Sequence, residues 1–464
     1  MRYTLATPPT PRTAPCARGR GRAAGVVAVG LVVLSSAACQ TYNQKTNAAF
    51  SDFEQGRFKA AMTTYGEGEV VDSPFLAGAE AGTAGLAAGD WDAALEYFGL
   101  ASNAIAAFEA EALLSATNTG ELLMSWVLNE GMKEYRGEGY ERVMMHSSYA
   151  LAFLAVGAVE DALVEVRLAN QILEHEEELY EKEYGAGGLG HFISAVGYEL
   201  VGRPDDAYID YERMEAKGLG GELVGRSLVR LARALSRTDE AERWEARFGV
   251  DIERPENAAR IIVIAGIGMG PEKREGTLVL PLEDGIFQLS IPVYESKPQP
   301  VPGVELEVVG EGPPIRSVVI ENVAEVARKN LADRIAWLTA KSAVRGVMKL
   351  QLTKRLEKDH GGWGALAGIL FTFVSERADL RSWRTLPDTW QACRLFLPPG
   401  SHELVLRAVG GDSVALGTFE LAPGETQFIF ARTLGHRLHA HVVGGGPAPS
   451  PAPEPPVAAA LPRD

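Results

Sequence analysis

The apolar positions of this chain follow two different periods along its length. Between residues 46 and 250 they recur about every 3.6 residues, which predicts amphipathic helices. From residue 257 onward the period falls to two, and short runs such as RIIVIA, IFQLSIPVY, HELVLRAV and TQFIFART are separated by turns rich in glycine and proline. We therefore predict an α+β fold, in which helices are followed by a strand-rich, sandwich-like part. Each sheet of that part is expected to be buried on one face, and a helical insertion is predicted at about residues 321–376.

The helical half contains a recurring segment, with steps of 33 or 34 residues up to the copy at Gly157 and then an interval of 45 residues, which holds an insertion, before the copy at Gly202. GRFKAAMTTY begins at Gly56, GDWDAALEYF at Gly89, GAVEDALVEV two steps later at Gly157, and GRPDDAYIDY at Gly202. A degraded fifth copy passes through Ala241. The spacing resembles that of the tetratricopeptide repeat, in which about 34 residues encode a pair of helices that stack into an α-solenoid. A helical bundle with alanine-rich seams is the alternative.

The residue types of each copy suit packed helical hairpins. Glycine allows a left-handed backbone in the turn between two helices, alanine lets the helices cross closely, and an aromatic ring one turn later fills the groove between hairpins. These predicted repeat-packing residues are Gly56, Ala61 and Tyr65, then Gly89, Ala94 and Phe98, then Gly157 and Ala162, and finally Gly202, Ala207 and Tyr211.

The N-terminus has the charge order of an export signal. Four arginines between residues 12 and 22 precede an uncharged, mostly apolar run over residues 23–38, and no acidic residue occurs before Cys39. The run is shorter than the ~20 residues that a helix needs to cross a bilayer. A cysteine directly after Ser-Ala-Ala resembles the bacterial lipobox, which implies cleavage before Cys39 and lipidation of its thiol. A plain secretory cleavage near the same point is the alternative.

The net charge limits the possible partners of this protein, and the cysteine count limits the possible disulfide bonds. Loss of residues 1–38 removes five arginines and changes the formal net charge from −16 to −21, which argues against nucleic acid and anionic lipid as main partners. Cys16 leaves with the signal and Cys39 would carry lipid, so Cys393 alone remains in the mature body and the fold must rest on packing. A chain of 464 residues, 46% of them apolar, has room for two or three domains.

The strand-rich half offers few groups for catalysis. His360, His402 and Cys393 are candidates for a ligand or hydrolytic site, but no spacing links the thiol to a histidine base, so we expect structural roles. The glycines of IAGIGMGP, over residues 264–271, are followed by a strand instead of a helix, so a strand-to-strand connection is predicted in place of a phosphate cradle. The uncharged run GGWGALAGILFTFVS, residues 361–375, is expected to be a buried helix, or alternatively one that dips into a membrane.

Histidines of the helical half are also expected to be structural. His175 lies among six glutamates over residues 174–184 but lacks the H-E-x-x-H spacing of a zinc site. A solvated helix face with a Glu178–Lys182 pair is predicted instead. His146 and His191 lie in apolar surroundings and are expected to be packed or to cap helices. No metal or cofactor is predicted.

Two long strings of this sequence resemble a known family. GEGYERVMMHSSYALAFLAVGAVEDALVEVRLANQILE and ADLRSWRTLPDTWQACRLFLPPGSHELVLR are similar to segments of bacterial tetratricopeptide-repeat lipoproteins without assigned chemistry, and the resemblance spans most of the mature chain. It implies a position at the periplasmic face of the envelope. Gln40, directly after the lipidated cysteine, would favour the outer membrane if the sorting rule of enterobacteria applies.

The predicted organisation is a signal peptide (1–38), a helical-repeat domain (39–252), a strand-rich domain (257–440) and a disordered Pro/Ala-rich tail (443–464). Two functions follow from it. The first is a non-catalytic adaptor that holds an envelope protein or peptide in a groove of the helical repeats, with Tyr149, Phe153 and Tyr198 as lining or packing residues. The second is a periplasmic ligand-binding protein or hydrolase with its site in the strand-rich domain.

Overall fold

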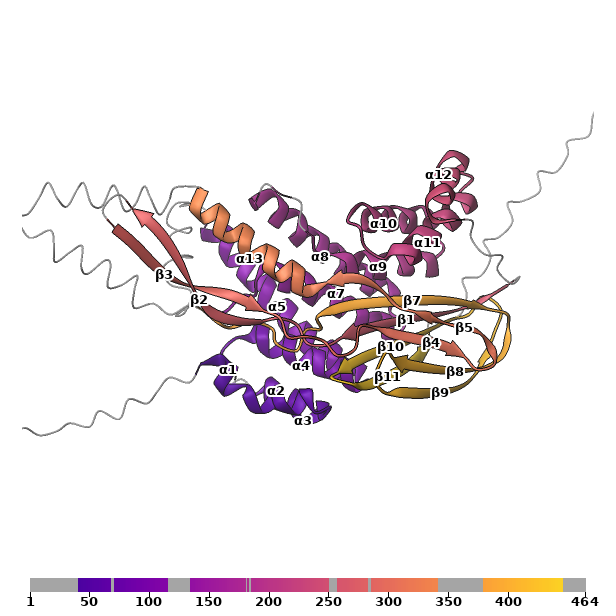
Figure 1. Ribbon diagram of the computed structural model, residues 1–464, viewed down its shortest axis with the longest axis horizontal. Helices are drawn as coiled ribbons and strands as arrows, with labels where there is room; N and C mark the ends of the chain where they lie inside the picture. Colours follow the sequence, from indigo (N-terminus) through magenta and orange to yellow (C-terminus); the bar gives the residue numbers. More distant parts are fainter. Residues whose placement is uncertain are drawn as a thin grey trace, which may run out of the picture. The chain divides into compact units, whose positions relative to one another are not determined.

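A computed structural model describes residues 41–67, 71–115, 134–180, 182, 185–249, 257–282, 285–340 and 379–444 (Figure 1). The signal peptide with Cys39, the run at 361–375, His360 and the tail beyond residue 444 lie outside the described residues. Helices occupy the N-terminal part and strands the C-terminal part, as the change of period predicts. The helical and strand-rich parts, which the sequence predicts as two domains, belong to one compact unit, Gln40–Asp464.

Helices of the N-terminal part pack in consecutive pairs. The short helix α1 (Tyr42–Lys45) precedes the pairs α2 (Asn47–Glu54) and α3 (Phe58–Gly66), α4 (Pro74–Ala88) and α5 (Trp91–Ser115), α7 (Gly139–Ala155) and α8 (Val159–Tyr180), α9 (Gly188–Leu200) and α10 (Pro204–Ala216), and α11 (Gly221–Ala234) and α12 (Thr238–Phe248). Each pair also packs against the next pair along the chain. We call α4, α7, α9 and α11 the first helices, and α5, α8, α10 and α12 the second helices.

The turn inside each helix pair has a left-handed residue. Gly56, Gly89, Gly157 and Gly202 have φ values of 76°, 70°, 78° and 71°. In the last pair Ser236, 34 residues after Gly202, takes the same conformation with a φ of 59°. A left-handed backbone costs glycine little and other residues roughly 1–2 kcal/mol. The fifth copy has serine at this turn, so it lacks the glycine that marks the other copies in the sequence.

Strands of the C-terminal part form two sheets and a separate ribbon. Sheet A has the order β11 (Arg437–Gly444), β10 (Thr426–Leu434), β1 (Ala259–Ile267), β7 (Thr389–Leu397), β6 (Val318–Asn322). Sheet C has the order β5 (Glu311–Arg316), β4 (Val304–Val308), β8 (Gly400–Ala408), β9 (Ser413–Leu421). The ribbon pairs β2 (Glu272–Leu282) with β3 (Gly285–Glu295), and α13 (Val323–Ala340) packs against β3, α7 and α8.

Sheet A is buried on both faces, whereas the sequence predicts sheets buried on one. Along β1, Ile261 and Val263 share a core with Leu306 of sheet C. The alternate residues Ile262 and Ile264 belong to the core that contains the helices. Because successive side chains of a strand point to opposite faces, β1 contributes to two cores at once. The arrangement is therefore three layers, with helices, sheet A and sheet C in that order.

Three element boundaries differ from the sequence prediction. The run IRSVVI is not one strand, because the chain passes from sheet C to sheet A at Ser317, whose Oγ accepts from the Val304 N–H at 3.0 Å and donates to Gln391 Oε1 at 2.7 Å. The helical insertion begins at Val323, since residues 321 and 322 still pair with β7. Strand β11 extends to Gly444, so the expected tail cannot begin at residue 443.

Candidate functional site: the buried interface between helices and sheet

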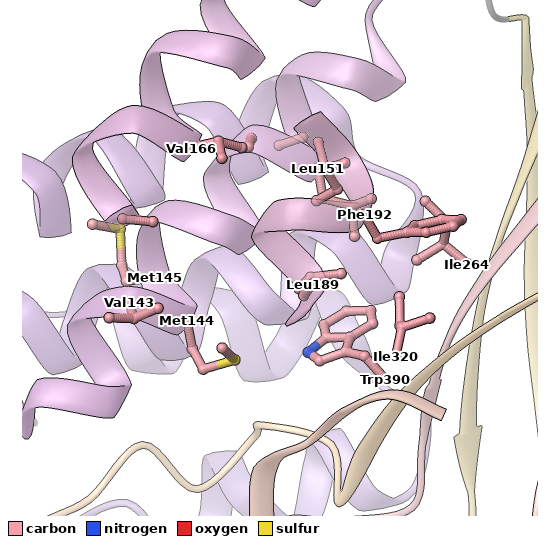
Figure 2. Packing of buried hydrophobic residues seen from close by; sticks show 14 of the residues in the cluster. Val143, Met144, Met145, Leu151, Val166, Leu189, Phe192, Ile264, Ile320 and Trp390 are labelled. Carbon is pink, nitrogen blue, oxygen red and sulfur yellow. The ribbon is translucent and has the colours of Figure 1, made fainter. Parts of the chain in front are cut away.

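Sheet A covers the face that the first helices form. Leu189 and Phe192 of α9 pack in one core with Ile264 of β1, Ile320 of β6 and Trp390 of β7 (Figure 2). All five side chains are buried. Burial of apolar surface contributes roughly 25 cal/mol per Å², so this shared core stabilises the contact between the helices and sheet A. The buried residues of the helices and these strand residues form one continuous hydrophobic cluster.

A buried carboxylate of α4 binds the backbone of the segment that leads into β7. Glu80 Oε1 accepts from the Arg384 N–H at 2.7 Å and from the Tyr42 hydroxyl at 2.9 Å, while Oε2 accepts from the Thr385 N–H at 2.9 Å. Burial raises the pKa of Glu80, and the hydrogen bonds act in the opposite direction. Glu80 therefore fixes residues 384 and 385 to the first-helix face through both backbone N–H groups, and it also forms a hydrogen bond with the Thr385 side chain.

A second carboxylate, on α7, binds the preceding residue of the same segment. Glu141 Oε1 accepts from the Trp383 N–H at 2.9 Å, and Oε2 accepts from the Tyr135 hydroxyl at 2.6 Å. The indole of Trp383 lies edge-on to Phe75 and donates from Nε1 to Thr83 Oγ1 at 3.1 Å. Three successive N–H groups, at residues 383, 384 and 385, are thus all accepted by carboxylates of first helices. We call residues 382–386 the crossing segment.

The side chain of Arg384 adds a contact to α2, at the N-terminal end of the described chain. Its guanidinium lies 3.7 Å from the ring centroid of Phe50 in α2, and Nη1 donates to Thr46 Oγ1 at 3.3 Å. Cation–π contacts of this kind contribute about 0.5–2 kcal/mol, more when they are desolvated as here. The crossing segment is therefore fixed through both its backbone and its side chains.

The ribbon is attached to the same place by a buried lysine. Lys273 at the base of β2 forms an ion pair with Glu138, which also accepts from Arg334 of α13 at 2.8 Å. Tyr294 of β3 lies 3.1 Å from Tyr140 of α7, hydroxyl to hydroxyl. Burial lowers the pKa of Lys273, but Glu138 and Glu141 outweigh it, so the net shift is upward and the lysine stays charged.

Two further glutamates connect helices with strands of sheet A outside the crossing segment. Glu199 of α9 accepts from Arg230 of α11 at 2.6 Å, from Arg394 of β7 at 3.0 Å and from Arg260 of β1 at 3.2 Å. Burial opposes ionisation of Glu199, but these arginines hold its pKa far below the usual range. Glu321 of β6 accepts from the Leu189 N–H at 3.2 Å and so caps the start of α9. Burial raises the pKa of Glu321 to about 7 in spite of such backbone donors.

The predicted repeat-packing residues include the four turn glycines described above, together with small and aromatic residues inside the helices. The small and aromatic members are buried, namely Ala61, Ala94, Ala162, Ala207, Tyr65, Phe98 and Tyr211. Two of the turn glycines also contact the sheet. A Cβ at Gly56 would lie 2.9 Å from the ring of His439, and one at Gly89 would lie 2.5 Å from the ring of His441, so β11 packs on the turns of the first two pairs.

The three residues predicted to line or pack a groove lie partly buried among the helices. Tyr149 packs on Phe153, with ring centroids 4.6 Å apart, and on Phe98 of α5 at 6.2 Å. Tyr198 lies under the guanidinium of Arg203 at 4.8 Å. Their position between helices is a packing role, and the larger part of the first-helix face is covered by sheet A.

The candidate chemical groups of the strand-rich part are separate from one another. Cys393 is buried in the core between the sheets, and burial raises its pKa to about 12. His402 lies 3.2 Å from Glu311 Oε1 and 2.9 Å from the Pro398 carbonyl oxygen. The structure does not bring either residue to the crossing segment.

Histidines of the helical part form buried pairs with acids. His146 Nδ1 lies 2.7 Å from Glu165 Oε2, and His191 Nδ1 lies 3.2 Å from Asp210 Oδ1. Both members of the second pair follow those of the first by 45 residues, the same offset as between Gly157 and Gly202, so the pairs occupy equivalent places in two hairpins.

The helix face around His175, which the sequence predicts to be solvated, is partly buried in the structure. Glu176 is buried and accepts from Arg142 at 2.9 Å. Lys182 donates to Asp333 of α13 at 2.6 Å, so the predicted Glu178–Lys182 pair gives way to a tertiary contact with α13. Among the described residues no group of histidine, cysteine and carboxylate side chains has the arrangement of a metal site.

Sequence reasoning missed the carboxylates that bind the crossing segment. Glu80 is the one charged residue between Pro74 and Ala88, and a lone charge in an apolar helix is a signal that it is buried and paired. Glu141 has no such signal, because charged neighbours surround it in the sequence. Trp383 and Arg384 lie inside one of the strings that carry the family resemblance, but nothing local indicates what they contact.

Comparisons with known proteins place few limits on this site. No protein-family model and no curated protein matches the chain. Among solved structures it is similar to a tetratricopeptide repeat protein from Parabacteroides merdae ATCC 43184, at 11% identity and a TM-score of 0.27, over 48% of this chain and 70% of that one. A superposition this loose supports no further argument. In the described part of the chain, every helix is too short or too polar to cross a membrane.

Proposed function

We propose that this protein is a lipid-anchored, non-catalytic adaptor of the bacterial envelope, and that its protein partner binds the outward side of the second helices. One observation carries the choice of surface. Sheet A covers the first helices, so the groove that a helical-repeat array can offer there is filled by the protein's own chain. Export, lipidation of Cys39 and a place at the periplasmic face of the outer membrane belong to the same proposal and rest on the N-terminal sequence.

The second helices expose apolar side chains that the fold does not use. Leu100 of α5 is 51% exposed, and Val164 of α8 and Ile209 of α10 are each 44% exposed. Val164 and Ile209 follow Gly157 and Gly202 by seven residues and therefore occupy equivalent positions in two hairpins. Leu100 lies one helical turn further along its own helix, eleven residues after Gly89.

Acidic residues lie on the same helices as Leu100 and Val164. Asp92 lies in the first turn of α5, and Glu160 and Asp161 lie in the first turn of α8, all of them exposed. The mature chain carries a strong negative charge, which steers a positively charged partner toward such a surface. The partner that fits is therefore a protein segment with apolar anchors flanked by lysine or arginine.

Site-specific crosslinking in cells that make the full chain tests this surface. A photoreactive residue placed at Leu100, Val164 or Ile209 should capture one and the same envelope protein. Thr418, on an exposed position of β9, is the matched control and should capture none of it. Equal capture from Thr418, or different proteins from the three helix positions, would contradict the proposed surface.

Two variants separate the parts of the proposal. Reversal of charge in the double variant Glu160→Lys, Asp161→Lys should weaken capture from Val164 several-fold without loss of folded protein, as judged by circular dichroism. Cys39→Ala should abolish labelling with a palmitate analogue. Labelling that persists in that variant would refute the lipid anchor and leave the binding surface untouched.

A further inference from the structure

Arg432 of β10 is a buried cation at the place where sheet A meets the crossing segment and α2. Its side chain lies between the helices and the sheet, and the residue is 5% exposed. The guanidinium donates from Nη1 to the Gly268 carbonyl oxygen and from Nη2 to the Thr385 carbonyl oxygen at 3.0 Å, and it lies 5.5 Å from the ring centroid of Phe53. It therefore ties β10 to the loop after β1 and to the crossing segment.

No carboxylate compensates this charge among the residues that the structure describes. Arg432 takes part in none of their ion pairs, whereas Arg394 of the same sheet, whose side chain is also inaccessible, pairs with Glu199 at 3.0 Å. Carbonyl dipoles and an aromatic face offset part of the cost of burying a guanidinium, but not its net charge. Burial accordingly lowers the pKa of Arg432 to about 9.

A small cavity adjoins this cation. Its volume is about 30 Å³, and Arg432, Trp390, Thr83 and His441 contribute its polar lining beside apolar side chains such as Phe430. Two buried donors on its lining residues, Nε of Arg432 and Nε1 of Trp390, have no acceptor among the described protein atoms. Buried N–H groups are nearly always hydrogen-bonded, so an acceptor inside the cavity is expected.

We propose that this cavity is a binding site for one small inorganic anion, with chloride as the ion of suitable size, held by Arg432 and Trp390. The cavity has room for an occupant about as large as a water molecule or slightly larger, which excludes phosphate and sulfate. An anion accepts both hydrogen bonds and also neutralises the guanidinium, whereas a water molecule does only the first. The ion would lie between α4, β7, β10 and β11 and would stabilise the contact of helices with sheet A.

Chloride dependence of thermal unfolding tests the site. Unfolding temperatures are compared in sodium chloride and in sodium gluconate of equal ionic strength, because gluconate is too large for the cavity. A ligand that binds only the folded state raises the folded-to-unfolded ratio about tenfold when its concentration is about ten times its Kd. We expect a rise of roughly 2 °C at that chloride concentration, and a further increase with the logarithm of the concentration. Equal unfolding temperatures in both salts would overturn the proposal.

Three variants assign the effect to the cavity. Arg432→Met removes the charge, and Trp390→Phe removes one donor while keeping an aromatic ring; both should lose the chloride response. Arg407→Gln, on the exposed side of β8, is the matched control and should keep it. A chloride response that survives in Trp390→Phe would place the ion elsewhere and refute this site, even if Arg432→Met fails to fold.

Crystals soaked in bromide give an independent readout. An anomalous peak in the cavity within hydrogen-bond distance of both donors is expected. Density for water alone at that position, with no anomalous signal, would show that the cavity does not select an anion and would overturn the inference.

Discussion

Replacement of Glu80 tests whether buried carboxylates hold the helices and the sheet together. Its two oxygens accept from the Tyr42 hydroxyl and from the Arg384 and Thr385 N–H groups, and Glu80 is fully buried. Glu80→Ala leaves three buried donors without an acceptor, and each such donor costs about 1–3 kcal/mol. The variant no longer has to bury a carboxylate, and this gain offsets part of the loss. We therefore expect a loss of about 4 kcal/mol in the free energy of unfolding, a large share of the ~5–15 kcal/mol that folded domains possess.

Glu80→Gln gives a finer test because it keeps the shape of the side chain. Its amide oxygen can replace Oε1, which accepts from Tyr42 and Arg384, but its NH₂ group then points at the Thr385 N–H. One hydrogen bond is lost and two donors face each other, so we expect a loss of about 2 kcal/mol. Tyr42→Phe removes one donor and leaves both backbone bonds, which should cost about 1 kcal/mol.

Urea unfolding followed by circular dichroism and by tryptophan fluorescence measures these losses. Hydrogen exchange adds a local readout, because the amide protons of Arg384 and Thr385 should exchange slowly in the wild type and much faster in Glu80→Gln. A Glu80→Gln protein as stable as the wild type, with both amides still protected, would refute the view that this carboxylate fixes the crossing segment.

Three further predictions follow from the same contacts. Gly89→Ala should lower the free energy of unfolding in urea by at least ~2 kcal/mol more than Gly202→Ala does. Both turns are left-handed, but an added Cβ meets the His441 ring only at Gly89. Equal losses in the two variants would contradict this prediction. Burial raises the pKa of Glu321 to about 7, so the folded state favours the protonated carboxyl. Its contribution to the free energy of unfolding is full below pH ~4.5, and about 3 kcal/mol of it is lost as the pH rises through about 7. Urea midpoints at pH 5 and pH 8 should therefore differ less in Glu321→Gln than in the wild type, and an unchanged difference would contradict the assignment. A chain truncated after residue 249 should bind ANS and aggregate, since its first-helix face loses sheet A; a stable monomer of that length would show that the helices fold alone.

Local patterns in the sequence determine the elements of this fold but not their layers. The change from a period of 3.6 to a period of two separates helices from strands, and four glycines mark the turns of helix pairs. The uninterrupted apolar run IIVIAGI of β1, residues 261–267, is also a signal for burial on both faces, since in a half-buried strand apolar residues alternate with polar ones. That signal indicates a covering layer without identifying it. Only tertiary structure shows that the helices supply it.

The candidate site depends on contacts between residues that are far apart in the sequence. Glu80 binds the N–H of Thr385 across 305 positions, and Glu141 binds that of Trp383 across 242. The N–H groups that donate these long-range hydrogen bonds belong to backbone amides, which every residue type except proline possesses, so these backbone hydrogen bonds leave no signal in the sequence of the crossing segment. A lone glutamate in an apolar helix predicts a buried partner but cannot say which part of the chain supplies it.

The cover of sheet A over the first helices changes how mutations in this protein should be interpreted. In a free helical-repeat array, a substitution on the first-helix face removes a contact with the partner and leaves the fold intact. Here a change at Phe192 or Trp390 opens a cavity in the shared core, which typically costs 3–5 kcal/mol, so loss of binding would follow from unfolding. Exposed positions such as Val164 and Ile209 carry no such cost, because substitutions there usually alter stability by less than about 0.5 kcal/mol. Loss of partner capture at those positions, in protein that remains folded, is therefore the evidence that distinguishes a binding surface from a structural one.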